Sequence, residues 1–260
     1  MIAHDRGEYE EALTWGQRAL DLVSEVDDPE EEVESYEVLI PPLIALGRFE
    51  EARGLAVVHD EVCSGLTAHH KVHGIGIIVE VEELLGGWDS IASLRDRIRK
   101  DIAANLGTPC VRNPRTLMAC AAAHEIIGEA EEARRLESEA GERAMEGYPL
   151  VLEPPRLRLR MARGDLDAVD DALGSFPQQR YWFAFALQAV VLDAYAALGE
   201  REAVEQHAAA IPGNNRYLEP FALRALGRVR RDEDLVRQAL EGFEALELPW
   251  QGDQTRALLA

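Results

Sequence analysis

The sequence predicts an all-α protein folded as a right-handed α-α superhelix, a solenoid of about seven helical hairpins. A phrase in which a glycine precedes an acidic helix start recurs along the chain. Its copies begin at Gly7, Gly47, Gly86, Gly128, Gly164 and Gly199. The intervals of 40, 39, 42, 36 and 35 residues are typical of stacked helix pairs that bury apolar faces against their neighbours. Apolar and polar residues alternate only over 157–161, which is too short and too close to prolines to predict a strand.

The first copy explains why the phrase makes a hairpin. Gly7 is able to adopt the positive φ that ends a helix, and Glu8 places an acid at the positive end of the next helix dipole. One face of that next helix carries Tyr9, Ala12, Gly16 and Ala19. Because most of these residues are small, we expect a neighbouring helix to approach closely here.

Capping residues mark three further helix starts. The segment 28–30 combines Asp28 as the N-cap, a proline at the first helical position and an acidic first turn. The segment 113–115 repeats this signal, with Asn113 as the cap of a helix that runs to Ile127. Asp232 and Glu233 predict a helix through Leu246.

Prolines predict the division of other helices. Pro41-Pro42 is expected to kink or split the helix before Gly47. Pro154-Pro155 is expected to open a shorter helix that ends at Gly164, and the segment 175–177 to precede a long helix through Leu198.

We expect one helical-repeat domain over 1–260. Regular repeats occupy 1–210, and residues 211–260 form degenerate capping repeats, because the spacing shortens after Gly199 to Gly227 and 211–215 is a loop signal. Only seven residues precede Glu8, so the first hairpin lacks most of its front helix. The chain is therefore expected to be a fragment of a larger protein.

Composition excludes several classes of function. The net charge of −21 disfavours binding to nucleic acid and to anionic membranes. The three cysteines are far apart and odd in number, which favours a reducing cytoplasm over a disulfide framework. The sequence has neither a phosphate-binding Gly-x-x-x-x-Gly-Lys-Ser/Thr loop nor a Gly-x-Ser-x-Gly elbow, so no catalytic residue is predicted. Acidic pairs such as Glu82-Glu83 are expected to form solvated helix faces.

The turn pattern Gly-x-aromatic-x-x-Ala, followed by small residues at Ala12 and Ala19, resembles the tetratricopeptide repeat. This resemblance covers about Gly7 to Ala208. The step exceeds the ~34 residues of that family in the first three intervals, and the copy at Gly199 lacks the aromatic residue.

Four longer segments resemble a more specific group of proteins. They are similar to the C-terminal helical repeats of large actinobacterial signalling ATPases and of LuxR-type or adenylate-cyclase-like transcriptional regulators. This resemblance implies a sensor or interaction arm in signal transduction and transcription regulation, with the ATPase domain of the parent protein as one possible partner. The segments are Leu66-Thr-Ala-His-His-Lys-Val-His-Gly74, Gly107-Thr-Pro-Cys-Val-Arg-Asn113, Leu218-Glu-Pro-Phe-Ala-Leu-Arg-Ala-Leu226 and Phe243-Glu-Ala-Leu-Glu-Leu-Pro-Trp250.

Four residues have the chemistry of a zinc site. His59 and Cys63 are four apart near the end of one helix, and His69 and His73 are four apart near the start of the next. Across an antiparallel hairpin these pairs would face each other as a tetrahedral set. Core packing of a histidine and an inert thiol explains them as well and is the favoured interpretation, so no metal or cofactor is predicted.

Arginines are the predicted partner contacts, because guanidinium groups pair carboxylates bidentately. The candidates are Arg112, Arg115, Arg156, Arg160 and Arg163. For Arg156, Arg160 and Arg163, intramolecular pairing with nearby acids is the favoured interpretation, and Arg112 and Arg115 form a second polar cluster. The aromatic run 181–185 is expected to pack mainly in the core.

These observations favour a non-catalytic interaction module. Its concave side, lined by the first helix of each hairpin, would bind a peptide, a protein or another domain of the parent protein. The second hypothesis is a sensor in which a small effector enters a pocket inside the curve and shifts the arm between two shapes. An unrecognised hydrolase or metal enzyme is the least favoured alternative.

Overall fold

A computed structural model describes residues 2–26, 28–105, 107–144, 149–174 and 184–260. In these ranges the regular secondary structure is helical and no strand occurs, which confirms the all-α prediction. None of the described helices is long and apolar enough to cross a membrane. The helices are α1 (Ile2–Asp5), α2 (Tyr9–Val26), α3 (Pro29–Ala45), α4 (Phe49–Ser64), α5 (Ala68–Leu85), α6 (Trp88–Ser93), α7 (Arg95–Ala104), α8 (Arg112–Ile126), α9 (Ala130–Glu142), α10 (Pro149–Arg163), α11 (Leu166–Leu173), α12 (Ala184–Leu198), α13 (Arg201–Ala209), α14 (Leu218–Arg230), α15 (Glu233–Ala245) and α16 (Pro249–Arg256).

The recurring glycines end helices as predicted. Gly7, Gly47, Gly86, Gly128, Gly164 and Gly199 have positive φ values between 70° and 90°. After each of them the next residue donates its backbone N–H to a carbonyl five residues earlier, as Glu8 does to Ala3 at 2.9 Å. This hydrogen bond defines a Schellman cap, which satisfies carbonyls left over at the helix end. The same turn therefore follows α1, α3, α5, α8, α10 and α12.

Two further turns of this kind were missed because they lack glycine. Arg231 and Glu247 both have a φ of 56°, and the residues after them make the same backbone hydrogen bond. The segment Arg231-Asp-Glu-Asp-Leu-Val236 shares both aspartates and the final valine with the fifth copy, Gly164-Asp-Leu-Asp-Ala-Val169, and has arginine in place of the glycine. The turn expected near Gly227 is thus at Arg231.

The small-residue face of α2 is only partly confirmed. A Cβ atom at Gly16 would lie 2.6 Å from a methyl carbon of Leu39, so the missing side chain lets α3 approach. Tyr9 and Ala12 are buried on the same face, whereas Ala19 is exposed.

The prolines do not divide helices, although the predicted end of a helix at Gly164 is confirmed. Pro41 and Pro42 lie inside the single helix α3, and Pro154 and Pro155 lie inside α10 rather than at its start. Proline removes one N–H donor each time, but the packing of these helices outweighs that loss.

The capping predictions had mixed outcomes. The predicted start of α3 is confirmed, because the Asp28 side chain accepts hydrogen bonds from the N–H groups of Glu30 and Glu31. The Asp232 side chain caps α15 in the same way. Asn113 is not a cap, since α8 already begins at Arg112. The segment 175–183 lies outside the described residues.

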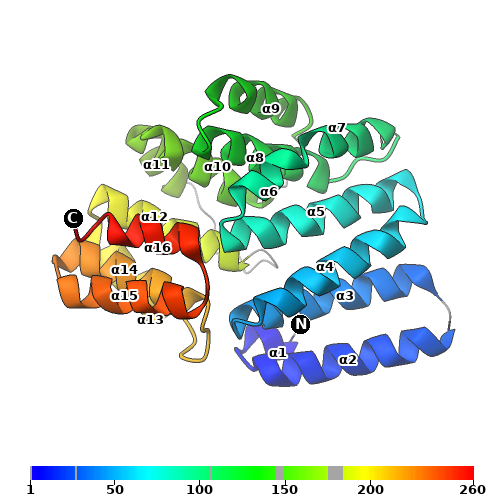
Figure 1. The fold of residues 1–260 in the computed structure, drawn as a ribbon, viewed down its shortest axis with the longest axis horizontal. Coiled ribbons are helices and arrows are strands. Elements are labelled where there is room, and N and C mark those ends of the chain that lie inside the picture. The colour runs from blue at the N-terminus through cyan, green and yellow to red at the C-terminus, as the bar shows by residue number, and fades with distance from the viewer. Residues whose placement is uncertain (1, 27, 106, 145–148, 175–183) are drawn as a thin grey trace.

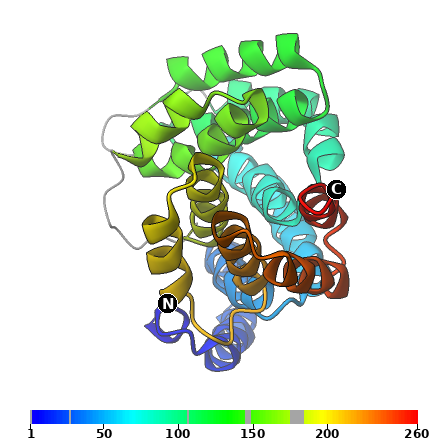
Figure 2. The same ribbon diagram turned by 90° about the vertical axis from the view of Figure 1, so that its left-hand side faces the viewer.

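Successive helices pack neighbour to neighbour, and the chain also curves back on itself. The C-terminal helices lie next to the N-terminal ones in both views (Figures 1 and 2). The backbone N–H of Arg216 donates to the carbonyl of Ala45 at 2.8 Å, and the Tyr217 hydroxyl donates to the carbonyl of Leu84, also at 2.8 Å. One hydrophobic core accordingly contains side chains from α2 to α5 and from α12 to α15.

Candidate functional site

A cavity of about 320 Å³ lies between α1, α2, α3, α5, α8 and α12. Five of these helices precede a glycine turn, and α2, which contributes Ala12, follows one. Most of the cavity wall is apolar, and a cavity of this volume accommodates a small organic molecule. The apolar lining consists of Ala12, Val38, Ile40, Pro41, Ile44, Ile77, Val81, Leu84, Phe185 and Ala186.

Two arginines of α8 form part of this lining and are almost completely buried. Arg112 and Arg115 are 1% and 0% exposed. Arg112 pairs with Glu37 at 2.6 Å and with Glu80 at 3.1 Å, and Arg115 pairs with Glu83 at 2.6 Å. We call these five residues the buried ion cluster. It joins α3, α5 and α8, and charge-assisted hydrogen bonds inside a low-dielectric core are strong.

A glycine on α5 makes room for these long side chains. A Cβ atom at Gly76 would lie 3.4 Å from the Thr116 hydroxyl and 3.5 Å from Cδ of Arg112. Because Gly76 has no side chain, the aliphatic part of Arg112 packs along α5 and its guanidinium reaches the glutamates. The first turn of α8 thus supplies both guanidinium groups of the buried ion cluster, and Gly76 of α5 leaves the space in which Arg112 lies.

The buried ion cluster has three glutamates but only two arginines, and Glu80 is the additional acid. Burial raises its pKa to about 7, although Arg112 and Arg115 lower it and Glu37 and Glu83 raise it further. Glu37 and Glu83 already balance the two arginines, so a proton on Glu80 leaves the buried ion cluster neutral. Near neutral pH this carboxyl group is therefore able both to donate and to accept a hydrogen bond at the cavity wall.

Glu37 connects the buried ion cluster to two histidines. Burial would raise the pKa of Glu37, but the Arg112 guanidinium and hydrogen bonds from His59 and His73 hold it well below its usual range. Its Oε1 atom lies 3.3 Å from Nε2 of His59 and 3.4 Å from Nδ1 of His73. The carboxylate of Glu37 thus stays ionised and orients both rings.

The other ring nitrogen of His73 faces a cysteine. Nε2 of His73 lies 3.6 Å from Sγ of Cys110, in the segment between α7 and α8. Burial lowers the pKa of His73, but hydrogen bonds with Cys110 and Glu37 outweigh it and raise that pKa to about 9. Burial raises the pKa of Cys110, but the hydrogen bond with His73 and one from the Arg112 backbone outweigh it and lower that pKa. Thiolate and imidazolium therefore stabilise each other.

The four residues considered as a zinc set do not meet, and the favoured interpretation, a core histidine and an inert thiol, fits His59 and Cys63. His59 points at Glu37, and its ring nitrogens lie 3.8 and 3.9 Å from Sγ of Cys63, which is fully buried. Burial raises the pKa of Cys63 to about 12, as is typical of an inert core thiol. Among the described residues, the ligand atoms that approach within 4.8 Å of one another belong to His69, His73 and Cys110. Cys110 therefore takes the place predicted for Cys63.

The arginine stripe of α10 is paired within the chain. Arg156 contacts Glu153 of the same helix, and Arg160 donates to the carbonyl of Ala168. Arg163 pairs with Glu125 and Glu137. These intramolecular contacts are the interpretation favoured from the sequence, and none of the three arginines lines the cavity.

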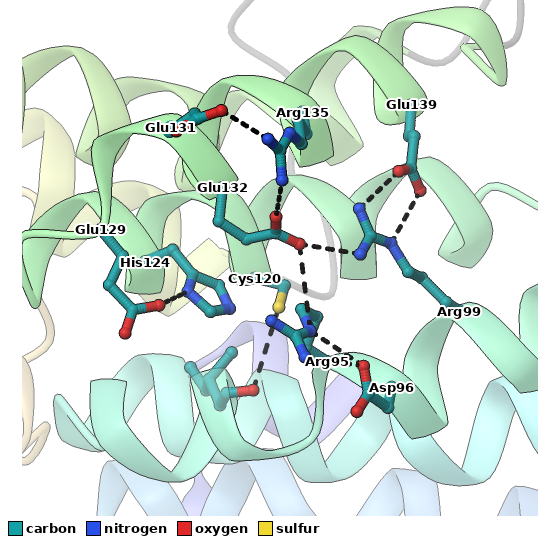
Figure 3. Close-up of polar contacts among 11 residues, drawn as sticks. Arg95, Asp96, Arg99, Cys120, His124, Glu129, Glu131, Glu132, Arg135 and Glu139 are labelled. Carbon is teal, nitrogen blue, oxygen red and sulfur yellow. Dashed lines mark hydrogen bonds and ion pairs between the residues drawn. The ribbon is translucent and has the colours of Figure 1, made fainter.

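Half-buried arginines on α7 are also paired internally. Figure 3 shows Arg99 between Glu132 and Glu139 of α9, at 2.8 and 2.5 Å. Arg95 reaches Glu132 at 3.9 Å, and Arg135 contacts the same glutamate from α9. This network connects α7 to α9 on the surface and is separate from the cavity.

The sequence analysis did not predict that Glu37, Glu80 and Glu83 belong to the site. Glu80 and Glu83 interrupt an apolar run on α5, and Glu37 sits among the apolar residues of α3. Acid within an apolar stretch is a signal for a buried charge that needs a partner. Glu83 was instead expected on a solvated face, whereas it is 8% exposed. Of the aromatic run, residues 181–183 lie outside the described part, and Phe185 forms part of the cavity wall.

No protein-family model matches the chain, and a search of curated proteins finds no match either. The resemblance to tetratricopeptide repeats and to the arms of signalling ATPases therefore stays a prediction.

Proposed function

We propose that this chain is a non-catalytic sensor module that binds a small effector in the cavity between its inner helices. The supporting observation is a cavity of about 320 Å³ with apolar walls and a buried ion cluster at one side. Pockets that hold small ligands have this size and this combination of apolar surface with few polar groups. The proposal also includes the right-handed solenoid expected from the sequence, with the cavity on the inner side of its curve.

The charges of the lining define the effector class. Four carboxylates, those of Asp5, Glu34, Glu37 and Glu80, outnumber the guanidiniums of Arg112 and Arg115. An anionic ligand would have to displace Glu37 and Glu80 from Arg112, or Glu83 from Arg115, which costs buried ion pairs. The effector is therefore a small, largely apolar molecule with a neutral or cationic polar end.

A matched ligand series tests the effector class. An alkyl amine, an alcohol and a carboxylate of one chain length are compared by their effect on the melting temperature, since a ligand that binds the folded state raises it. We expect stabilisation by the amine or the alcohol and none by the carboxylate. Preference for the carboxylate, or no stabilisation by any member of the series, would contradict the proposal.

The substitution Val38→Trp tests the place of binding. Val38 lines the cavity and is 40% exposed, so a larger side chain there covers the cavity without overpacking the core. The affinity for a bound effector should fall at least about tenfold. Val58→Trp is the matched control, because Val58 is 37% exposed and lies outside the cavity lining. Equal affinities of the two variants would exclude this cavity as the site.

A protein partner is the second candidate, and the outer face of α2 favours it. Trp15, Leu22 and Val26 lie on one helical face and are 56%, 63% and 72% exposed. Glu11 accepts a hydrogen bond from the Trp15 indole and Glu25 is also exposed, so acid flanks this apolar stripe. The stripe matches an amphipathic helix with an apolar face and basic flanks.

A titration of a basic amphipathic peptide, followed by tryptophan fluorescence, tests this second candidate. Leu22→Glu should weaken binding at least about tenfold, because it buries a charge in the apolar contact. Leu166→Glu is the control, since Leu166 is 41% exposed on the distant helix α11. Unchanged or tighter binding by both variants would mean that only the net charge of the chain attracts the peptide, because each substitution adds a negative charge.

A further inference from the structure

We infer that His69, His73 and Cys110 form a zinc site with three protein ligands and a fourth position for water. One ligand atom from each residue lies within 4.8 Å of the other two. Two imidazole nitrogens and one thiolate are ligands that zinc prefers, and an open fourth position is compatible with its tetrahedral geometry. The inference does not depend on the proposed effector cavity.

The separation between His73 and Cys110 in the structure matches zinc coordination. Zinc–nitrogen bonds of about 2.05 Å and a zinc–sulfur bond of about 2.3 Å place tetrahedral nitrogen and sulfur ligands about 3.6 Å apart. Nε2 of His73 and Sγ of Cys110 are 3.6 Å apart. These two atoms are therefore already separated by the distance expected for two ligands of one tetrahedral zinc ion.

His69 completes the set from the same helix as His73. The two residues are four apart at the start of α5, so they share one face, and their ring centroids are 4.5 Å apart. Nδ1 of His69 is buried and has no hydrogen-bond partner among the described residues. A buried nitrogen lone pair without a partner carries a free-energy cost that metal coordination would remove.

The neighbouring residue His70 is not a member of this set. Its Nδ1 lies 2.8 Å from the hydroxyl of Thr67, whose side chain also caps α5. Its ring centroid is 5.9 Å from that of His69 and 6.5 Å from that of His73. His70 is therefore a control residue with the same chemistry and a different environment.

Glu37 provides the outer-shell support that a zinc-bound histidine needs. Its carboxylate faces Nδ1 of His73 at 3.4 Å, which directs Nε2 toward Cys110. Histidine ligands of zinc commonly donate their other N–H to a carboxylate in this way. Arg112 pairs with the other oxygen of Glu37 at 2.6 Å and so holds this carboxylate in place.

Such a zinc ion would tie two distant segments together. The histidines belong to the first turns of α5, whereas Cys110 lies in the segment that leads into α8 two residues before Arg112. Occupancy of the site would thus fix the start of α8, where both arginines of the buried ion cluster are anchored. We expect zinc to raise the melting temperature of the intact chain, because it binds only where these segments are assembled.

Cobalt(II) substitution of the reduced, metal-stripped chain tests the inference, since a cobalt–thiolate bond gives a charge-transfer absorption that a free thiol lacks. We expect one cobalt ion per chain with this band, displaced by one equivalent of zinc. Cys110→Ser should abolish the band, and Cys63→Ser should keep it. His69→Gln should weaken metal binding at least about tenfold, whereas His70→Gln should leave it unchanged.

Three outcomes would overturn the inference. The first is the absence of a thiolate band in the wild-type chain, which would leave Cys110 and His73 as a metal-free ion pair. The second is a band that persists in Cys110→Ser. The third is a band lost in Cys63→Ser, which would restore the set expected from the sequence. Circular dichroism of each variant separates loss of metal from loss of fold, and Val38→Trp, which lies in the cavity wall, should bind cobalt normally.

Discussion

At the residue scale, the buried ion cluster is the most consequential feature of the molecule. Burying a charge without a partner is far more costly than burying an apolar side chain of similar size. Arg112 and Arg115 are tolerated because Glu37 and Glu83 each lie 2.6 Å from one of them. Glu80 is the additional acid, and its protonation state decides whether the cluster is neutral or carries one negative charge.

Glu80 predicts a pH dependence of stability. Its pKa is about 7 in the folded chain against an ordinary value of 4.5, so the folded state binds a proton that the unfolded state has lost. Stability from this group is therefore present at low pH and falls as the pH rises through 7. Ionisation costs up to about 3 kcal/mol at pH 8, from 1.36 kcal/mol per pKa unit.

Glu80→Gln should remove this dependence. Glutamine keeps an oxygen that accepts a hydrogen bond from Arg112 but has no proton to lose. Relative to the wild type, the variant should gain stability as the pH rises from about 5.5 to 8, measured by urea unfolding. Glu34→Gln, at an exposed position in the cavity lining, controls for loss of a carboxylate. A stability difference that is the same at both pH values would contradict the assigned protonation of Glu80.

At the scale of the element, the repeated unit is the turn rather than the helix. Helix lengths differ and prolines fall inside α3 and α10, yet the same left-handed cap follows eight helices of the described chain. Six of these caps have glycine, which takes positive φ at no steric cost, and two have arginine or glutamate. The conformation is set by the backbone hydrogen bonds and by packing on both sides.

Reciprocal substitutions test the turns. Gly128 has a φ of 90° and open space around it, so Gly128→Ala should cost about 1 kcal/mol from backbone strain alone. Arg231→Gly should relieve the same strain and raise the free energy of unfolding by about 0.5 kcal/mol, after the added freedom of the unfolded chain is counted. Chemical denaturation of both variants measures these effects, and a destabilised Arg231→Gly variant would show that the arginine side chain contributes more than the strain costs.

At the scale of the whole molecule, the chain closes on itself. In an open solenoid each repeat touches only its neighbours. Here Tyr217 and Gln251 both donate to the carbonyl of Leu84, and Asn215 donates to the Tyr9 hydroxyl. The C-terminal segments are therefore bonded to α2 and α5 as well as to their neighbours in sequence.

This closure predicts that both ends of the chain unfold together. Tyr217→Phe removes one buried hydrogen bond and should lower the free energy of unfolding by about 1 kcal/mol. Hydrogen exchange should speed up in α5 as well as in α14, because the hydroxyl joins these two helices. Faster exchange confined to α14–α16 would mean that the C-terminal helices open independently.

The sequence by itself determined the all-α class, the six glycine turns and the starts of α3 and α15. These features depend on local chemistry: positive φ is accessible to glycine, and a side chain two or three residues away satisfies the first N–H groups of a helix. The same local reasoning misplaced the prolines of α3 and α10 and overlooked the turns at Arg231 and Glu247, where packing outweighs backbone preference.

Only the tertiary structure decided which charged and metal-binding residues meet. Arg112 and Arg115 were named from the sequence as surface contacts, yet they are buried on glutamates 32 to 75 positions away. Cys110 replaced Cys63 beside His73 because the segment before α8 folds over the start of α5. Contacts of this kind depend on how helices cross and on which core volume remains, and the linear spacing of residues encodes neither.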